Sequence, residues 1–212
     1  MVRTVAAILV LGLAALPAAA QPAISFEENA VVARGLTAGG SVVWFGVARE
    51  RINWTSHVTE WQDAEALVDK DGWATLNLGR EVPVKSVWVA VDMTTGGFAA
   101  SSPPTYPWAT HAAFPTEGAV FASDRVSLLS FRDDRQELEV LVVRPTVGAW
   151  RATVRHDDPA SKEGPGVVFS YSDLIPWGKL PSSPGKLVPG DVIVAIDPNR
   201  MEYFAQQLGP GR

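Results

Sequence analysis

The sequence contains no cysteine, which removes two means of stabilising or anchoring a protein. Without thiols the chain cannot be cross-linked by disulfide bonds, so its stability has to come from packing. It also cannot carry a lipid on an N-terminal cysteine, which excludes the usual lipoprotein anchor. The 212 residues suffice for one large domain or two small domains with ordinary hydrophobic cores.

Long apolar runs and an excess of basic residues are missing too. After residues 1–20, no stretch of about 18 apolar residues occurs, so we expect no membrane span once that first segment is cleaved. The formal net charge is −5. A mildly acidic surface is repelled by phosphate backbones and anionic lipids, so we expect no nucleic acid partner.

Residues 1–20 have the order of a secretory signal peptide. Arg3 is followed by an uncharged apolar run over residues 5–16 and then by small residues ending at Ala20. The run is too short to cross a hydrocarbon core, and the small residues fit a cleavage site. We expect the mature chain to begin near Gln21 and to be secreted or periplasmic in a bacterium, or held at the cell surface.

The chain from residue 24 to residue 101 consists of short β-prone runs separated by turn residues. The run at residues 42–47 is nearly continuously apolar, which is typical of a strand buried on both faces. Residues 57–68 favour a strand, with a helix around residues 63–67 as the alternative. Asp69, Asp71 and Gly72 predict a tight hairpin turn, because glycine supplies positive φ and aspartate bonds its own backbone. The expected strands are residues 30–34, 42–47, 57–68, 73–78, 84–93 and 98–100.

Three stretches of this segment carry a family resemblance: residues 35–44, 69–74 and 86–92. Together with the regular strand spacing, they resemble a bacterial immunoglobulin-like or fibronectin-type domain over about residues 24–101. The resemblance implies an antiparallel immunoglobulin-like β-sandwich with a spacer or recognition role rather than a reaction.

Closely spaced prolines then predict a linker at residues 102–118, because proline removes a ladder donor. The expected organisation is therefore a signal peptide (1–20), a β-sandwich (21–101), this linker and a smaller β-rich module (119–212). We detect no internal repeat.

The second module is expected to be β-rich with a short C-terminal helix. Residues 145–148 predict a hairpin turn, followed by an alternation that gives one dry and one wet face. Residues 199–208 predict the helix, since Met201, Phe204 and Leu208 recur at helical spacing. The expected strands are residues 125–131, 138–144, 149–155, 167–171 and 192–196.

No catalytic, cofactor-binding or metal-binding residue is assigned from the sequence. His57, His111 and His156 are far apart, and none has a partner at a two-ligand spacing. The turn at residues 69–72 resembles the start of a calcium loop, but the required glutamate is replaced by Leu78. We find no P-loop, dinucleotide fingerprint or nucleophile elbow.

Eight tryptophans suggest a carbohydrate-binding alternative, because flat indoles stack on sugar rings. Trp44 and Trp88 lie in apolar strands and are expected in the core. The tryptophans in polar or Pro-rich surroundings could be exposed: Trp54, Trp61, Trp73, Trp108 and Trp177.

Residues 189–193 resemble the P-G-D-V-I strand entry of PDZ domains. The chain ends too soon after Ile196 for that family's later elements, and a Pro-Gly-Asp turn before any strand would give the same letters. Our expectation is a non-catalytic binding or structural module of the bacterial envelope or surface, with a protein or a carbohydrate as partner. The alternatives are a metal-dependent hydrolase built from the scattered histidines and nearby aspartates, and a peptide-binding module, either PDZ-like or using the edge strand near Val167.

The signal peptide makes the first testable prediction. N-terminal sequencing of protein recovered from the intact organism should begin near Gln21, because the small residues before it fit the peptidase site. Recovery of protein that retains Met1 from the cytosol would contradict export.

Overall fold

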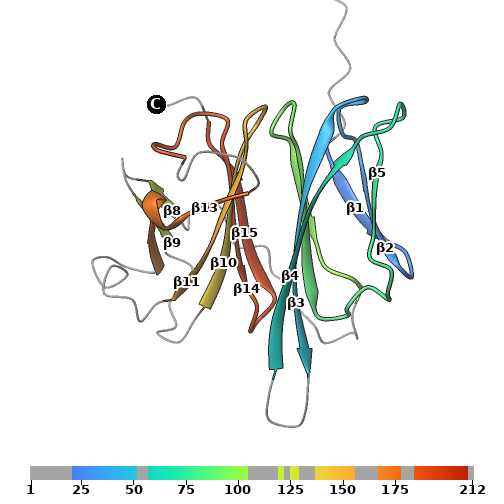
Figure 1. Cartoon of the computed structure of the whole chain (residues 1–212), viewed down its shortest axis with the longest axis horizontal. Helices are drawn as coiled ribbons and strands as arrows, with labels where there is room; N and C mark the ends of the chain where they lie inside the picture. Colours follow the sequence, from blue (N-terminus) through green and yellow to red (C-terminus); the bar gives the residue numbers. More distant parts are fainter. Residues whose placement is uncertain are drawn as a thin grey trace, which may run out of the picture.

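The protein is described from a computed structural model, and the strands in the described part of the chain form four antiparallel sheets (Figure 1). The structure describes residues 21–51, 57–104, 119–121, 125–128, 137–155, 167–177 and 184–209. The expected signal peptide, most of the expected linker and two of the three histidines lie outside these residues. The expectation of a mostly β, antiparallel fold is confirmed.

Strands up to Ser101 form the first half, which has an outer and an inner sheet. The outer sheet has the order β1-β2-β5 and consists of β1 (Ala23–Phe26), β2 (Ala30–Arg34) and β5 (Ala74–Asn77). The inner sheet has the order β4-β3-β6-β7 and consists of β3 (Ser41–Arg51), β4 (His57–Leu67), β6 (Ser86–Asp92) and β7 (Phe98–Ser101).

Strands from Ala119 onward form the second half in the same manner. Its outer sheet has the order β12-β9-β8, with β8 (Ala119–Phe121), β9 (Arg125–Leu128) and β12 (Val167–Ser170). A short 3-10 helix, η3 (Tyr171–Asp173), follows β12. The inner sheet has the order β13-β11-β10-β14-β15, with β10 (Glu137–Arg144), β11 (Gly148–Arg155), β13 (Ile175–Pro176), β14 (Val192–Asp197) and β15 (Glu202–Gln207).

The central strands of the two inner sheets, β3, β6, β10 and β14, are buried on both faces. In β3, Val42 and Trp44 pack toward the outer sheet, whereas Val43 and Phe45 pack toward the second half. Successive side chains of a strand point to opposite faces, so a strand between two cores must be apolar at every position. This explains the continuous apolar run at residues 42–47 and confirms the expectation of burial on both faces.

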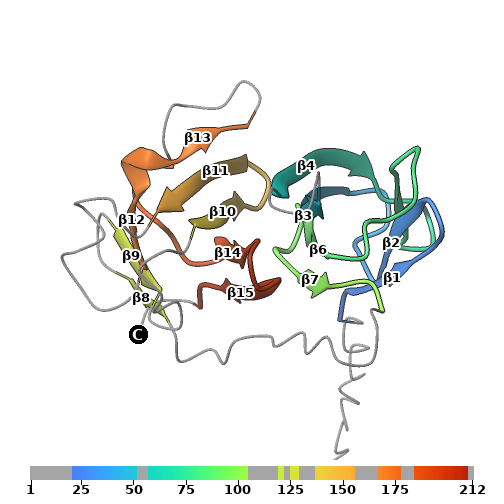
Figure 2. The same cartoon turned by 90° about the horizontal axis from the view of Figure 1, so that it is seen from below.

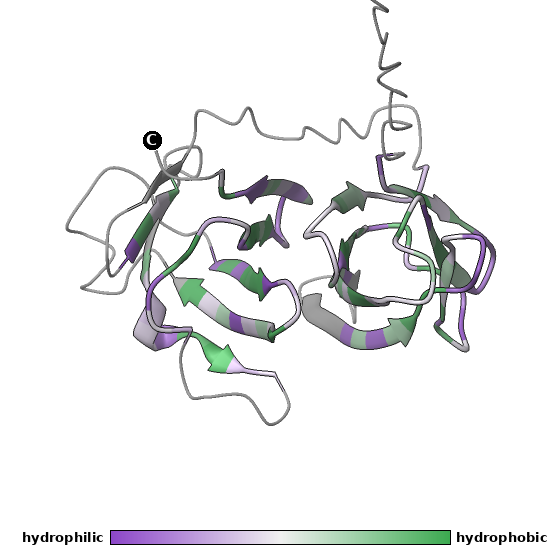
Figure 3. Ribbon diagram, turned by 90° about the horizontal axis from the view of Figure 1, so that it is seen from above, coloured by the Kyte–Doolittle hydropathy of each residue, from purple (hydrophilic) through white to green (hydrophobic). Residues whose placement is uncertain are grey.

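A single apolar cluster joins the two halves, and we call it the shared core. Figure 2 shows the inner sheets facing one another, and Figure 3 shows hydrophobic segments along their strands. Every member is at most 8% exposed. The shared core consists of Val43, Phe45, Val47, Val87, Val89, Val91 and Met93 from the first half, and Leu141, Val143, Ala149, Val192, Val194, Ile196 and Met201 from the second.

The second half repeats the strand order of the first. The outer order β1-β2-β5 corresponds to β8-β9-β12, and the inner order β4-β3-β6-β7 corresponds to β11-β10-β14-β15, with β13 added at one edge. The corresponding strands β6 and β14 carry related sequences, Val-Trp-Val-Ala-Val-Asp at residues 87–92 and Val-Ile-Val-Ala-Ile-Asp at residues 192–197. The expectation that the chain has no internal repeat is therefore wrong at the level of topology.

The predicted C-terminal helix at residues 199–208 is also wrong, because this segment forms β15. Asp197 does not cap a helix; its carboxylate accepts the backbone N–H of Asn199 at 2.7 Å and closes a hairpin turn between β14 and β15. Apolar residues recur at helical spacing in this segment because the strand is covered on both faces, so its apolar side chains do not alternate strictly with polar ones. Phe204 packs against the second half's own core, while Tyr203 packs against the shared core.

The turn at Asp69 and Gly72 is confirmed, but it does not make a hairpin. Gly72 has φ +78°, and the Asp69 carboxylate accepts the N–H groups of Asp71 and Trp73 at 2.9 Å. The turn connects β4 of the inner sheet to β5 of the outer sheet, and β5 pairs with β2 instead. The turn is thus a corner between two sheets.

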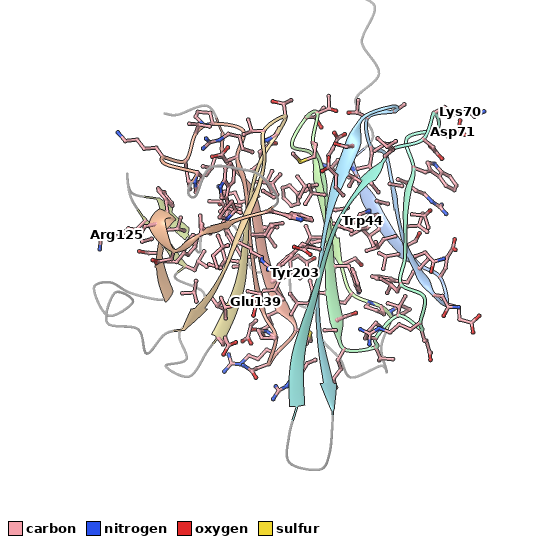
Figure 4. The ribbon with its side chains drawn as sticks, in the orientation of Figure 1. Trp44, Lys70, Asp71, Arg125, Glu139 and Tyr203 are labelled. Atoms are coloured by element: carbon pink, nitrogen blue, oxygen red, sulfur yellow. The ribbon has the colours of Figure 1, made fainter. Side chains whose placement is uncertain are left out.

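The expected hairpin at residues 145–148 is confirmed, since β10 and β11 pair across it. The dry face of β11 is confirmed as well, with Trp150, Ala152 and Val154 all buried. Trp44 and Trp88 lie in the core as expected (Figure 4 labels Trp44).

Gly72 and Gly79 form a matched pair that tests the corner. Both have positive φ, but a Cβ at Gly72 would lie 2.7 Å from the Leu36 carbonyl oxygen, whereas nothing lies near one at Gly79. Gly79→Ala should cost about 1 kcal/mol of unfolding free energy from its backbone conformation alone. Gly72→Ala should cost about 2–4 kcal/mol because a steric clash is added. Equal losses in denaturant titrations would contradict the close packing of this corner.

Candidate functional site

A cleft of about 780 Å³ opens where the two halves meet. Its walls come from both halves, so neither half contains it alone. The described residues that line it are hydroxyl-bearing, small or apolar, with one carboxylate and one indole among them. The lining residues are Gly39, Gly40, Ser41, Val43, Glu65, Leu67, Met93, Thr94, Thr146, Val147, Gly148, Ala149 and Trp177.

Hydrogen bonds between backbone groups fix the cleft floor. The Thr146 N–H, in the turn between β10 and β11, donates to the Met93 carbonyl oxygen at 2.7 Å and so joins the halves directly. Thr146 has φ +63°, a conformation that non-glycine residues seldom adopt. The Met93 N–H in turn donates to the Ser41 carbonyl oxygen at 2.9 Å. The floor is therefore a continuous hydrogen-bonded chain from β3 to the second half.

Asp92 ties two loops of the first half together beneath the cleft. One carboxylate oxygen accepts the N–H and the hydroxyl of Thr37, both at 2.7 Å, and the other accepts the Thr94 N–H at 2.8 Å. Burial alone would raise the pKa of Asp92, but the hydrogen bonds from Thr37, Thr94 and Thr95 outweigh it and leave the pKa below its usual value. The Asp92 carboxylate is therefore ionised at neutral pH, beside the contact between Gly40 and Thr94.

Trp177 forms the wall on the second half. Its backbone N–H donates to the Ala149 carbonyl oxygen at 2.9 Å, and its half-buried indole packs against the shared core. An indole anchored on one side and open on the other is suited to contact with an apolar ligand surface.

The outer rim is apolar with one acidic side chain. Leu67 at the end of β4 is 83% exposed, and Val147 opposite it is 50% exposed. Glu65 is also exposed and lies two residues before Leu67, on the same face of β4. Large apolar side chains exposed around a cleft mark a surface for contact with a partner.

Polar groups flank the shared core away from the cleft. Asp63 of β4 pairs with Arg151 of β11 at 3.5 Å, and the Tyr203 hydroxyl donates to the Ala100 carbonyl oxygen at 3.1 Å. Glu139 accepts the Thr153 hydroxyl at 3.0 Å; burial raises the pKa of Glu139, and the hydrogen bond from Thr153 offsets this in part. Burial also raises the pKa of Tyr203. Figure 4 shows Glu139 and Tyr203 in the second half beside the shared core. The Asp63–Arg151 and Tyr203–Ala100 contacts join the two halves, whereas the Glu139–Thr153 hydrogen bond lies within the second half.

Of the candidate residues from the sequence analysis whose side chains are described, Trp177 lies in this cleft and Trp73 does not. His57 begins β4, its side chain is outside the described residues, and His111 and His156 are outside them entirely. Trp54, Trp61 and Trp108 fall outside the described side chains as well, and Trp73 is exposed on the outer corner beneath Arg34.

The PDZ-like segment forms a turn at Gly190 and then β14, which is hydrogen-bonded to β10 and β15. A strand paired on both sides has no edge to offer a peptide. Asp191 in that turn is buried and holds Arg144 in a bidentate pair at 2.9 Å, which is a structural role.

The cleft residues were missed because no local pattern marks them. They come from five separate segments, three in the first half and two in the second, and the two sets meet only when the halves dock. Trp177 is the one member that the sequence had singled out as an exposed indole.

No family model matches the sequence, and no curated protein matches it either. Among the residues that the structure describes, no group of three or more His, Cys, Asp or Glu residues could hold a metal ion. The same residues include no helix long and apolar enough to cross a membrane.

Asp92 provides a test of how the cleft floor is held. Asp92→Asn should lower the unfolding free energy at neutral pH by about 2 kcal/mol, because a charged acceptor of several N–H and O–H groups is lost. Since the native pKa is lowered, this stabilisation is present above about pH 4, the unfolded value, and is lost as pH falls further. The difference between the variant and the wild type should therefore shrink in acid.

Asp71→Asn on the exposed outer corner is the control, and it should change stability by less than about 0.5 kcal/mol. Denaturant titrations across the pH range make the comparison. A loss from Asp92→Asn that is the same at every pH would show that ionisation of Asp92 contributes nothing.

Proposed function

We propose that the chain is an exported, non-catalytic binding module of the bacterial envelope or surface, and that it binds its ligand in the cleft between its halves. The cleft itself is the observation that carries this proposal. A pure spacer needs no cavity, whereas here two loops, a hairpin turn and an indole converge on one. The partner is a protein or a carbohydrate.

The immunoglobulin-like or fibronectin-type assignment is part of this proposal. Its support is the strand order: β1-β2-β5 packs on β4-β3-β6-β7, so the third strand pairs with the fourth and sixth while the fifth crosses to the other sheet. The second half follows the same order and extends the proposal to a tandem pair. Such folds carry recognition on loops and sheet edges held by a rigid scaffold.

The chemistry of the cleft supports binding rather than reaction. Among the described residues that line the cleft, Glu65 is the one carboxylate, it is exposed, and none is a histidine or a cysteine. Acid–base and nucleophilic catalysis need such groups within hydrogen-bond reach of each other. The cleft offers hydroxyls, backbone groups and apolar surface, which are the components of a recognition site.

Neighbouring threonines allow the proposal to be tested. Thr94 lines the cleft, whereas Thr95 is exposed on the same turn and does not. Peptide and glycan arrays probed with the mature chain should yield a ligand whose binding is lost in Thr94→Arg, because the long side chain fills the cleft, and is retained in Thr95→Arg.

Two outcomes would contradict the proposal. Ligands that bind both variants equally would place recognition elsewhere. Chemical conversion of a bound ligand would favour the hydrolase alternative.

A further inference from the structure

The edge of β4 is the feature of the molecule that the proposed function leaves unused. β4 runs for 11 residues and pairs along its whole length with β3 on one side only. In the described part of the chain it is the terminal strand of its sheet. Figure 2 shows β4 at the margin of the inner sheet, on the same side of the molecule as β13.

A long, unprotected edge is unusual in a protein that folds stably. Unpaired backbone N–H and C=O groups invite pairing with another strand, and native proteins usually keep edge strands short. The other terminal strands here, β1, β5, β7, β8, β12, β13 and β15, have two to six residues. The edge of β4 therefore has more main-chain pairing capacity than any of them.

Side chains beside this edge continue into the cleft. Asp63, Glu65 and Leu67 alternate along β4 and so share the face that looks toward the second half. Across from them, Val147 lines the cleft, and Ile175 of β13 is 61% exposed two residues before Trp177. A strand added to β4 would place alternate side chains against this apolar rim.

The charges at the edge indicate which strand would fit. Asp63 is already paired with Arg151, whereas Glu65 has no ion pair with any of the described residues. A second copy of the chain pairing through β4 would bring acidic side chains together, and the protein carries a net charge of −5. A partner strand with a lysine or an arginine would instead complement Glu65.

We propose that the edge of β4 binds an extended peptide segment of a partner protein by strand addition, with apolar side chains at alternate positions entering the cleft and a basic side chain facing Glu65. The inference rests on the proposed function and names its ligand class. Main-chain hydrogen bonds to β4 supply affinity, and the cleft and Glu65 supply selectivity.

Selection from a random linear heptapeptide library displayed on phage tests the proposal with the mature chain. Enriched peptides should alternate apolar residues and carry a lysine or an arginine. Synthetic copies should bind about tenfold more weakly to Glu65→Lys, because an attraction becomes a repulsion. Glu81→Lys makes the same charge change at an exposed position outside the cleft and should leave binding unchanged.

Two further measurements separate strand addition from ordinary cleft binding. Peptides methylated at alternate backbone nitrogens should lose binding, because they can no longer donate to an edge strand. Hydrogen exchange of amides in β4 should slow when the unmodified peptide binds.

The contribution of the apolar rim is tested by a matched pair of variants. Leu67→Ser should weaken binding, whereas Val84→Ser, at another exposed apolar position, should not.

The possible failures of this inference can be told apart. No enriched peptide, or peptides that bind after methylation and protect only the cleft turns, would overturn strand addition. A glycan that binds the wild type but not Thr94→Arg would overturn the peptide inference and leave the proposed function standing. The absence of any peptide or glycan ligand would overturn both.

Discussion

The shared core is the interaction on which the rest of the structure depends. If the halves separated, each inner sheet would expose the whole apolar face that packs in the shared core, while its other face stayed buried in the core of its own half. Apolar burial contributes roughly 25 cal/mol per Å². Docking of the halves is thus part of folding, and it creates the cleft, since the loops that line it meet only across this core.

The two halves approach one another at turns as well as at sheets. Gly96, with φ +73°, lies against Pro145 and the Gly190 carbonyl oxygen, so a Cβ there would collide with the second half. The Gln207 side-chain amide donates to the Thr95 carbonyl oxygen at 3.1 Å close by. Directed contacts of this kind fix the position of one half relative to the other, whereas a purely apolar interface would let the halves slide. A binding site with walls from both halves requires that fixed position.

Much of the fold could be predicted from the sequence, because the strands are either continuously apolar or alternating. β15 could not, since Phe204 faces one core and Tyr203 the other, and burial on both sides removes the alternation. The duplication was hidden because corresponding positions differ in size, as with Trp88 and Ile193. Outside β6 and β14, topology is retained while the side chains that fill each core have changed.

The candidate site could not be predicted from the sequence, for a different reason. A cleft between docked halves depends on which loops become neighbours in space, and local sequence patterns do not predict those neighbours. Only Trp177 could be singled out from the sequence, because it is a tryptophan in polar, proline-containing surroundings. The edge of β4 likewise became visible only when β5 was found to pair with β2 rather than with β4.

Native-state hydrogen exchange of Val194→Ala tests the shared core most directly. Val194 is fully buried in the shared core, and its truncation should cost about 1–3 kcal/mol. Protected amides of β2, in the distant outer sheet of the first half, should lose as much protection as those of β9 in the second half, because the halves unfold as one unit. A loss confined to the second half would contradict the account.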